Sequence, residues 1–333
     1  MKRRDFIVIP PAVGAIAVAA ALALPGNQAR AQTWLGLDTQ AGPAGSWKKL
    51  LTKTNFILNY TFPAGLSLNF NLRNFALSAG WNGTEIIEAK IVVPVTTVVG
   101  STAISTPAFD TDTGFPAGST IDLTVDGLIA GAGGKGGTAS SNAAVRAPGA
   151  TGGPALRVRY TTTIRGTGTI GGGGGGGGAG QGRGWYNSAC AGKGCTPTTY
   201  YRYFGGGGGG EGAGANRMGV GGGDTTLNTN YRYRYATNGA AGNNTVGGNG
   251  GQSSYGSDGP NDYSQGGYGG KGGNLGVAGA VGGQGSHAGE CCFYPTPFEW
   301  YPATTGGAPG VAVEGNTFIT WASTPTRIGA IVA

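Results

Sequence analysis

Hydrophobic and polar positions alternate in several short stretches of the chain, and this alternation predicts β-strands with one buried face. In residues 116–129, Ile121, Leu123 and Val125 fall on one side of an extended strand. Residues 155–170 repeat the same order of features: an alternating segment, a glycine turn, an isoleucine and then a run of glycines. We therefore expect stacked β-rungs that lead into a glycine-rich layer.

A short helix and further strands are predicted around these rungs. In residues 71–80, leucine, phenylalanine and alanine share one helical face, while Asn71 can cap the N-terminus and Gly80 can end the helix. Residues 56–60 alternate weakly, which predicts a strand. Residues 86–99 are apolar and β-branched, which favours a buried strand in which Pro94 marks an irregularity or an edge.

The C-terminal end completes a fold that we expect to be mostly β. Residues 316–321 and 327–332 predict two strands, which we expect to close the structure as a C-terminal β-hairpin. A conventional hydrophobic core can come only from residues 56–170 and from these last strands, because the intervening chain has few aliphatic side chains. The prediction is a small N-terminal α+β region and stacked rungs, followed by a glycine-rich region.

Glycine dominates the middle of the chain, with 72 glycines in the 333 residues of the protein. Residues 171–178 and 205–210 are uninterrupted runs within a glycine-rich zone at 131–310. Such a zone is either a flexible linker or an ordered lattice of extended polyglycine II helices, which pack closely because no Cβ intervenes. Serine is sparse in the runs and large aromatic clusters interrupt them, which favours the ordered lattice. Collagen is excluded, because glycine does not recur strictly at every third residue with abundant proline.

The N-terminus has the features of an export leader. Arg3 and Arg4 precede a polar and then an apolar residue, as in the twin-arginine consensus, and an alanine-rich apolar stretch follows. Ala29 and Ala31 provide the small-x-small pattern of a cleavage site. A membrane anchor is the alternative, but the apolar stretch is short and contains two prolines. No later segment is apolar enough to span a bilayer.

Candidate catalytic groups are few and scattered. The chain has one histidine, His287, in a glycine-rich context, and its carboxylates lack a calcium-type spacing. Asp110 and Asp112 flank a threonine, and another pair, Asp258 and Asp262, lies in a loop-like stretch; any of the four could ligate a hard cation. No phosphate-binding signature follows the glycine runs. We therefore expect neither an enzyme nor a cofactor or metal site.

The net charge does not indicate a nucleic-acid partner. The formal charge is +7, and several of the positive residues lie in the predicted leader. The remaining excess is small and dispersed, unlike the clustered basic surface of a nucleic-acid-binding protein. Nucleic acid is therefore not expected as a ligand.

Four cysteines, Cys190, Cys195, Cys291 and Cys292, lie in aromatic stretches outside the glycine runs. Their spacing is poor for a zinc site. If the leader directs export, the compartment is oxidising and disulfides are expected, although four cysteines allow three pairings. These disulfides would brace loops, with or without a role in recognition.

Aromatic stretches between the glycine runs are the candidate binding surface. Tyrosine and tryptophan give rigid, amphipathic contact area at a low cost in conformational entropy. The alternative is that they cover the edges of the lattice and bind nothing. The candidate receptor-binding residues are Trp185, Tyr186, Tyr200, Tyr201, Tyr203, Tyr231, Tyr233, Tyr235, Tyr255, Tyr263, Phe293, Tyr294, Trp300 and Tyr301.

Several motifs together resemble the glycine-rich tail-fibre tip adhesins of T-even-like phages and the C-terminal regions of related host-specificity tail proteins. The resemblance covers roughly residues 66–180 and 305–333, and it rests on residues 71–83, residues 114–121, the glycine runs and the two C-terminal strands. It implies a sandwich of polyglycine II helices whose connecting loops contact a bacterial receptor. The export leader departs from that family, because a tail protein assembled in the cytoplasm does not need one.

The sequence therefore predicts a leader at 1–31, a β-rich docking region at 32–130, a receptor-binding region at 131–310 and C-terminal strands at 311–333. The predicted function is a non-enzymatic adhesin for a bacterial surface protein or glycan, with a fibre or anchor protein as a further partner of the N-terminal region. A secreted structural glycine-rich protein without a specific ligand is the alternative. The leader predicts a secreted or cell-surface location, whereas the resemblance implies the tip of a virion tail.

Overall fold

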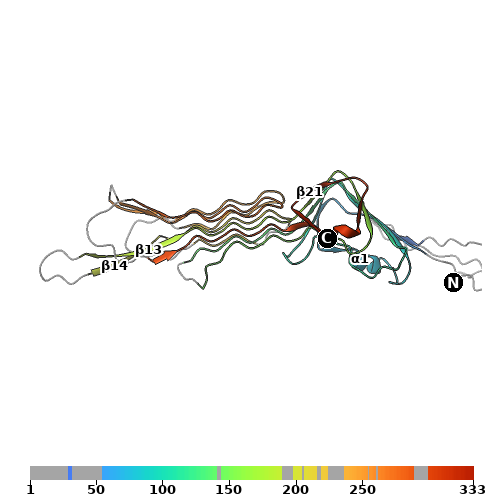
Figure 1. The fold of residues 1–333 in the computed structure, drawn as a ribbon, viewed down its shortest axis with the longest axis horizontal. Helices are drawn as coiled ribbons and strands as arrows, with labels where there is room; N and C mark the ends of the chain where they lie inside the picture. The colour runs from blue at the N-terminus through green and yellow to red at the C-terminus, as the bar shows by residue number, and fades with distance from the viewer. Residues whose placement is uncertain are drawn as a thin grey trace, which may run out of the picture.

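The protein is elongated and mostly β, with a sheet-rich part at one end and long extended segments leading away from it (Figure 1). The single α-helix of the described residues, α1, lies in the sheet-rich part, and strands β13 and β14 lie at the opposite end. The computed structural model describes residues 29–31, 55–140, 144–189, 198–204, 206–215, 219–223, 236–253, 255–259, 262–288 and 299–333.

Three sheets form the sheet-rich part, which we call the β-prism. The first has the order β1 (Ala29–Ala31), β2 (Phe56–Thr61), β5 (Ile87–Val93), β8 (Thr120–Val125), β11 (Thr162–Arg165), β20 (Ile319–Trp321). The second has the order β3 (Gly65–Leu68), β6 (Thr97–Gly100), β9 (Leu128–Ala130), β12 (Thr169–Gly171), β21 (Thr326–Ile328). The third has the order β4 (Phe70–Asn71), β7 (Phe109–Asp110), β10 (Leu156–Arg157), β19 (Val311–Glu314), β22 (Ala330–Val332).

The chain visits the three sheets in turn, so that each circuit adds one rung to the β-prism. Strands β2, β3 and β4 make the first rung, and β5, β6 and β7 make the second. Pairing between successive rungs is parallel, whereas β1 pairs antiparallel with β2 at one edge. The predicted stack of β-rungs is therefore present, and Pro94 marks the corner between β5 and β6 rather than an irregularity within one strand.

Inward-facing aliphatic columns form the core of the β-prism. Ile91, Leu123 and Ile164 occupy matching positions on three successive rungs, and each is fully buried. Burial of an aliphatic side chain of this size contributes about 2 kcal/mol to stability. The alternation recognised in the sequence thus corresponds to one buried and one outer face on each strand.

Helix α1 (Leu72–Ser78) follows β4 and begins and ends as the sequence predicts. The side-chain oxygen of Asn71 accepts a hydrogen bond from the N–H of Asn74 at 2.8 Å. Gly80 has a φ of +102°, a conformation that glycine adopts without strain and that ends the helix. Leu72 and Ala76 are buried, so the helix packs against the first rung.

The predicted C-terminal β-hairpin is wrong. Strands β20, β21 and β22 lie in three different sheets, and each pairs in parallel with a strand of the preceding rung. A hairpin requires two neighbouring antiparallel strands. Here the last strands instead make one more circuit of the β-prism, because the preceding rung offers each of them a free parallel edge.

The glycine-rich layer consists of two excursions from the β-prism. Residues 131–155 connect β9 to β10, and residues 172–310 connect β12 to β19, so both leave between the second and third sheets. The extended segments of the two excursions run alongside one another away from the β-prism (Figure 1). Most of their hydrogen bonds join the backbones of different segments.

The hydrogen bonds of segment 172–180 repeat with a period of three residues. Consecutive residues donate their N–H groups to three different neighbours in turn: segment 277–280 (from Gly175 and Gly178), segment 150–153 (from Gly173 and Gly176) and segment 210–213 (from Gly174 and Gly177). A Cβ on these glycines would meet other segments, since it would lie 1.9 Å from the carbonyl oxygen of Lys135 at Gly176 and 1.9 Å from that of Gly307 at Gly175. The glycines at 172–178 are therefore enclosed on every side and leave no room for side chains.

Outer segments of the layer have one face open to solvent, and there every third residue carries a side chain. Residues 266–274 read Gly-Gly-Tyr-Gly-Gly-Lys-Gly-Gly-Asn, and Tyr268, Lys271 and Asn274 are exposed while most of the intervening glycines are buried. The uninterrupted runs at 171–178 and 206–210 are fully buried. Uninterrupted glycine runs thus lie in the enclosed part of the layer, whereas a Gly-Gly-X repeat lies where one face is open to solvent.

Replacement of an enclosed glycine by alanine is expected to destabilise the protein strongly. In Gly176→Ala the new Cβ meets a backbone carbonyl that cannot move alone, and we expect a loss of about 3 kcal/mol or more. Gly222→Ala is the matched control, because its Cβ would lie 3.5 Å from Thr138 Cγ2, an ordinary contact. Thermal unfolding of both variants checks this, and equal melting temperatures would contradict the enclosed packing.

Candidate functional site

Two small antiparallel sheets lie at the end of the glycine-rich layer that is remote from the β-prism, which we call the far end (Figure 1). One has the order β14 (Thr198–Phe204), β13 (Gly182–Ala189), β18 (Glu299–Tyr301), and the other has the order β15 (Tyr255–Gly259), β16 (Asp262–Gln265), β17 (Ser286–Ala288). The glycine-rich run ends at Gly180, and strand β13 begins directly after Gln181. Aromatic residues replace glycine there, and their strand propensity favours antiparallel pairing.

The far end brings together candidate residues that are distant in the sequence. In the β13–β14 pair, Tyr186 lies opposite Tyr201, and Gly184 lies opposite Tyr203. Strand β18 pairs with the other edge of β13 and brings Trp300 opposite Arg183. The described candidates at the far end are Trp185, Tyr186, Tyr200, Tyr201, Tyr203, Tyr255, Tyr263, Trp300 and Tyr301.

The remaining predicted residues lie outside the described part of the chain or far from this end. Tyr231, Tyr233, Tyr235, Phe293, Tyr294, all four cysteines (Cys190, Cys195, Cys291, Cys292), Arg3 and Arg4 are outside the described residues. Ala29 and Ala31, the predicted cleavage site, belong to β1 and pair with β2 in the β-prism. The leader and the disulfides therefore stay predictions.

The turns at the opposite end of the layer carry no aromatic side chains among the described residues, and they pack on the second sheet of the β-prism. The methyl group of Ala215 is so close to Gly100 of β6 that a Cβ there would lie only 2.2 Å from it. Leu275 approaches Gly171 of β12 in the same way and forms a small apolar cluster with Ala130 and Ala213. The turns at this end of the layer thus serve to pack the layer on the β-prism.

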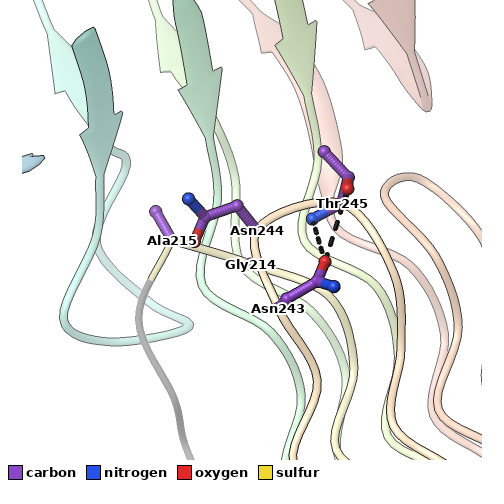
Figure 2. Close-up of a pocket in the computed structure, with 5 residues that line it drawn as sticks. All are labelled: Gly214, Ala215, Asn243, Asn244 and Thr245. Atoms are coloured by element: carbon purple, nitrogen blue, oxygen red, sulfur yellow. Dashed lines mark hydrogen bonds between the residues drawn. The ribbon is translucent and has the colours of Figure 1, made fainter. Parts of the chain in front are cut away.

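A pocket of about 340 Å³ lies at this junction and is lined by Gly214, Ala215, Asn243, Asn244 and Thr245 (Figure 2). The side-chain oxygen of Asn243 accepts hydrogen bonds from the N–H groups of Thr245 at 2.9 Å and Val246 at 2.7 Å, which stabilises the turn. The lining residues have no ionisable side chain. Among the described residues, the lining of the pocket therefore offers neither acid–base groups nor charged ligands for catalysis.

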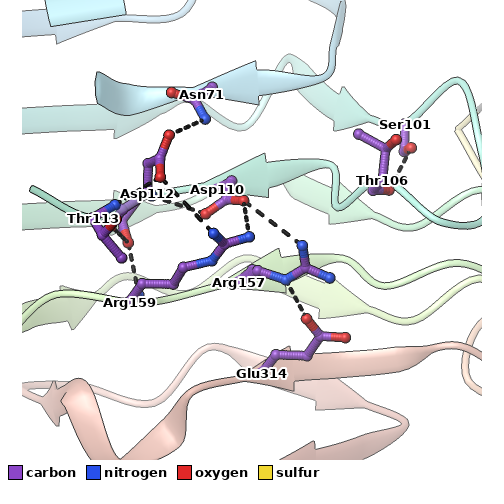
Figure 3. Close-up of polar contacts among 10 residues, drawn as sticks. Asn71, Ser101, Thr106, Asp110, Asp112, Thr113, Arg157, Arg159 and Glu314 are labelled. Carbon is purple, nitrogen blue, oxygen red and sulfur yellow. Dashed lines mark hydrogen bonds and ion pairs between the residues drawn. The ribbon is translucent and has the colours of Figure 1, made fainter. Parts of the chain in front are cut away.

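Two of the four candidate aspartates, Asp110 and Asp112, are paired with arginines on the outer face of the third sheet (Figure 3). Asp110 Oδ2 lies 3.0 Å from Arg159 Nη2 and 3.9 Å from Arg157 Nη1, and Arg157 also pairs with Glu314. Asp112 Oδ2 accepts a hydrogen bond from Asn71 Nδ2 at 3.0 Å. Among the described residues, no group of three or more His, Cys, Asp or Glu side chains could hold a metal ion.

Burial and hydrogen bonding shift the two aspartates in opposite directions. Burial raises the pKa of Asp110 above its usual value, although the N–H of Asp112 and the guanidinium groups of Arg159 and Arg157 oppose the rise. The hydrogen bond from Asn71 lowers the pKa of Asp112, assisted by the N–H of Thr113 and by Arg159. These ion pairs link neighbouring rungs, which is a structural role.

Two residues at the far end are not among the sequence-predicted sites. Arg146 donates hydrogen bonds to the carbonyl oxygens of Ser140 at 3.1 Å, Gly180 at 2.7 Å and Pro302 at 2.8 Å. Gln181 is 7% exposed, and its side-chain oxygen accepts a hydrogen bond from the N–H of Gly285 at 2.7 Å. The sequence signal for Gln181 is a long polar side chain that directly follows residues 171–180, all of which are glycine or alanine.

Comparison with protein-family models finds one match that covers most of the chain. The model of the phage tail fibre adhesin Gp38 family matches residues 57–332. No curated protein and no solved structure matches the chain. The described part of the chain contains no helix with the length and apolar character needed to cross a membrane.

The opposite pKa shifts of Asp110 and Asp112 predict opposite pH dependences for their asparagine variants. Because the pKa of Asp112 is lowered in the fold, its stabilisation is present above its usual pKa of 3.8 and is lost as the pH falls through the lowered value. Because the pKa of Asp110 is raised, its contribution is present below 3.8 and is lost as the pH rises through the raised value.

Urea unfolding between about pH 2.5 and about pH 7 measures both effects. The difference in unfolding free energy between wild type and Asp112→Asn should grow with pH, while the difference between wild type and Asp110→Asn should shrink. Two differences that change in the same direction would contradict the assigned shifts.

Proposed function

The chain belongs to the phage tail fibre adhesin Gp38 family, and on that premise we propose that it is a non-enzymatic receptor-binding protein of a phage tail tip. In this proposal the aromatic stretches at the far end of the glycine-rich layer contact a protein or glycan on the bacterial surface. The β-prism end, including the predicted docking region, attaches the protein to the fibre.

The observation that carries the proposal is the difference between the two ends of the glycine-rich layer. The described aromatic candidates of β13, β14, β15, β16 and β18 gather at one end, whereas the described turns at the other end are small and pack on the β-prism (Figure 1). Aromatic residues that merely covered the edges of the layer would be spread along its length. Tyrosine-rich strands and loops that extend from a rigid support resemble other recognition surfaces, in which aromatic anchors contribute most of the binding energy.

We also propose that the layer consists of polyglycine II helices, which would make it a stiff arm. The three-residue period of the hydrogen bonds of segment 172–180 supports this, because polyglycine II has three residues per turn. At about 3.1 Å per residue, nine such residues span roughly 28 Å. Such an arm would hold the receptor-binding strands well away from the fibre.

The family assignment favours the virion tail over secretion as the location of the protein. The predicted twin-arginine leader at 1–31 and the disulfides that depend on an oxidising compartment remain predictions, and the mass of the protein purified from particles tests both. A chain that retains residues 1–31 and has free thiols would exclude an exported form.

Truncation of two tyrosines that lie opposite one another at the far end is expected to weaken cell binding. The double variant Tyr186→Ala, Tyr201→Ala removes residues that lie opposite one another in β13 and β14. Fluorescently labelled wild-type protein is first tested on a panel of bacterial strains. On any strain that it labels, we expect the variant to lose at least about tenfold in affinity, as for aromatic hot spots.

Phe318→Ala is the matched control, because Phe318 is an aromatic residue of the β-prism and is 45% exposed. It should leave binding unchanged, and thermal unfolding should show that all variants are folded. Equal binding by the tyrosine variant and wild type would refute recognition through β13 and β14. A wild-type protein that labels no strain would favour the structural, ligand-free alternative.

A further inference from the structure

Side chains replace backbone hydrogen bonds where the glycine-rich layer meets the two far-end sheets. Within the layer, segments are joined mostly by N–H and C=O groups of glycine. At the boundary, the N–H of Ala179 instead donates to Thr304 Oγ1 at 2.7 Å, and the side chains of Arg146 and Gln181 join separate segments. We call Arg146 and Gln181 the boundary pair.

Arg146 connects three chain segments through one guanidinium group. Its Nη2 donates to Gly180, which lies two residues before β13, and its Nε donates to Pro302, which follows β18 directly. Its Nη1 donates to Ser140, across the loop that the Thr138–Ala147 bridge closes. The planar guanidinium carries donors in a fixed fork, whereas lysine presents one compact ammonium group and cannot reproduce these directions.

Gln181 connects the two far-end sheets to each other. It precedes β13 directly, and its side-chain oxygen accepts from Gly285, which precedes β17 directly. Its backbone N–H donates to Gly283 at 3.0 Å, and its carbonyl accepts from Gly267 at 2.7 Å. The Gln181 side chain is almost fully buried, so water has little access to the position of its oxygen. Loss of that oxygen would therefore leave the N–H of Gly285 without this partner, which costs stability.

We propose that the boundary pair acts as a set of positioning residues, which fix the two far-end sheets relative to one another and thereby set the affinity for the receptor. This inference rests on the proposed function. The strands of each sheet join the layer largely through glycine, which restricts backbone conformation less than any other residue. Contacts that hold both sheets in place before binding reduce the ordering cost of association, and their loss acts mainly on the dissociation rate.

The short excursion 131–155 gains a role from this inference. It reaches the boundary with the far-end sheets and then returns to the β-prism. It contains no tyrosine or tryptophan, so it contributes none of the aromatic candidates. It supplies Arg146 instead, which braces the segments next to β13 and β18. Affinity would then depend on a segment that supplies none of the candidate contact residues.

Two variants with matched controls test the boundary pair in the full-length protein. Arg146→Lys keeps the charge but loses the fork, and Arg165→Lys is its control, because Arg165 pairs with Asp122 on the β-prism at 3.1 Å. Gln181→Met keeps the length but loses the acceptor, and Gln284→Met is its control at an exposed position of the layer. Hydrogen–deuterium exchange of β13 and β17 and dissociation from a strain that wild type labels are both measured.

We expect backbone exchange in β13 and β17 to rise by about tenfold in Arg146→Lys and Gln181→Met, with exchange in the β-prism unchanged. Dissociation from cells should accelerate by about tenfold in the same variants, and the controls should match wild type. Unchanged exchange would overturn the positioning role, whether or not any strain binds. Faster exchange with unchanged dissociation would overturn its contribution to recognition. If wild type labels no strain, the proposed function fails, and exchange alone decides whether the pair positions the sheets.

Discussion

The close approach of one backbone to another is the constraint on which the rest of this structure depends. Segment 172–180 lies among neighbours whose carbonyl oxygens occupy the positions where Cβ atoms would be, as at Gly175 and Gly176. Only glycine fits there, and each enclosed glycine gives up more conformational entropy on folding than any other residue. Hydrogen bonds from successive residues to different neighbours offset that loss, because each N–H of residues 172–180 finds an acceptor.

The β-prism supplies the order that an all-glycine layer cannot supply for itself. Glycine runs have no side chains to fix which segments pair or in which register. The two excursions leave from adjacent rungs at β9 and β12, whose register is set by buried columns such as Ile129 and Ile170. The small residues Gly100 and Gly171 on the outer face of the second sheet then admit the turns at Ala215 and Leu275. A hydrophobic core thus fixes the start of each excursion, and backbone hydrogen bonds continue that register along the layer.

This division explains how a protein with a small conventional core can hold aromatic strands far from that core. The layer consists of enclosed glycine runs and outer Gly-Gly-X repeats, with a few buried side chains such as Ala179, Ala213 and Glu211, so its construction uses none of the aromatic residues at the far end. The boundary pair is where the two requirements meet, because there the position of the far-end sheets depends on specific side chains rather than on glycine.

Local patterns in the sequence determined the elements of the β-prism. Alternation at Ile121, Leu123 and Val125 identified a strand with one buried face, and Asn71 and Gly80 marked the helix ends, because these signals arise from short-range geometry. The two glycine runs indicated an ordered layer, yet the three-residue spacing of the outer segments was missed. That spacing is visible only where a segment carries side chains, so the uninterrupted glycine runs do not display it.

Contacts between distant residues could be decided only by the tertiary structure. The last strands read as a hairpin because they are adjacent in the sequence, whereas each pairs in parallel with an earlier rung. The gathering of aromatic stretches at one end follows from the direction in which each segment of the layer runs, which glycine does not encode locally. Arg146 gave no signal in the sequence, because its role depends on carbonyl groups at Gly180 and Pro302 that come near only when the layer has assembled. Side-chain periodicity specifies which face of a segment is buried, but not the segment on which it packs.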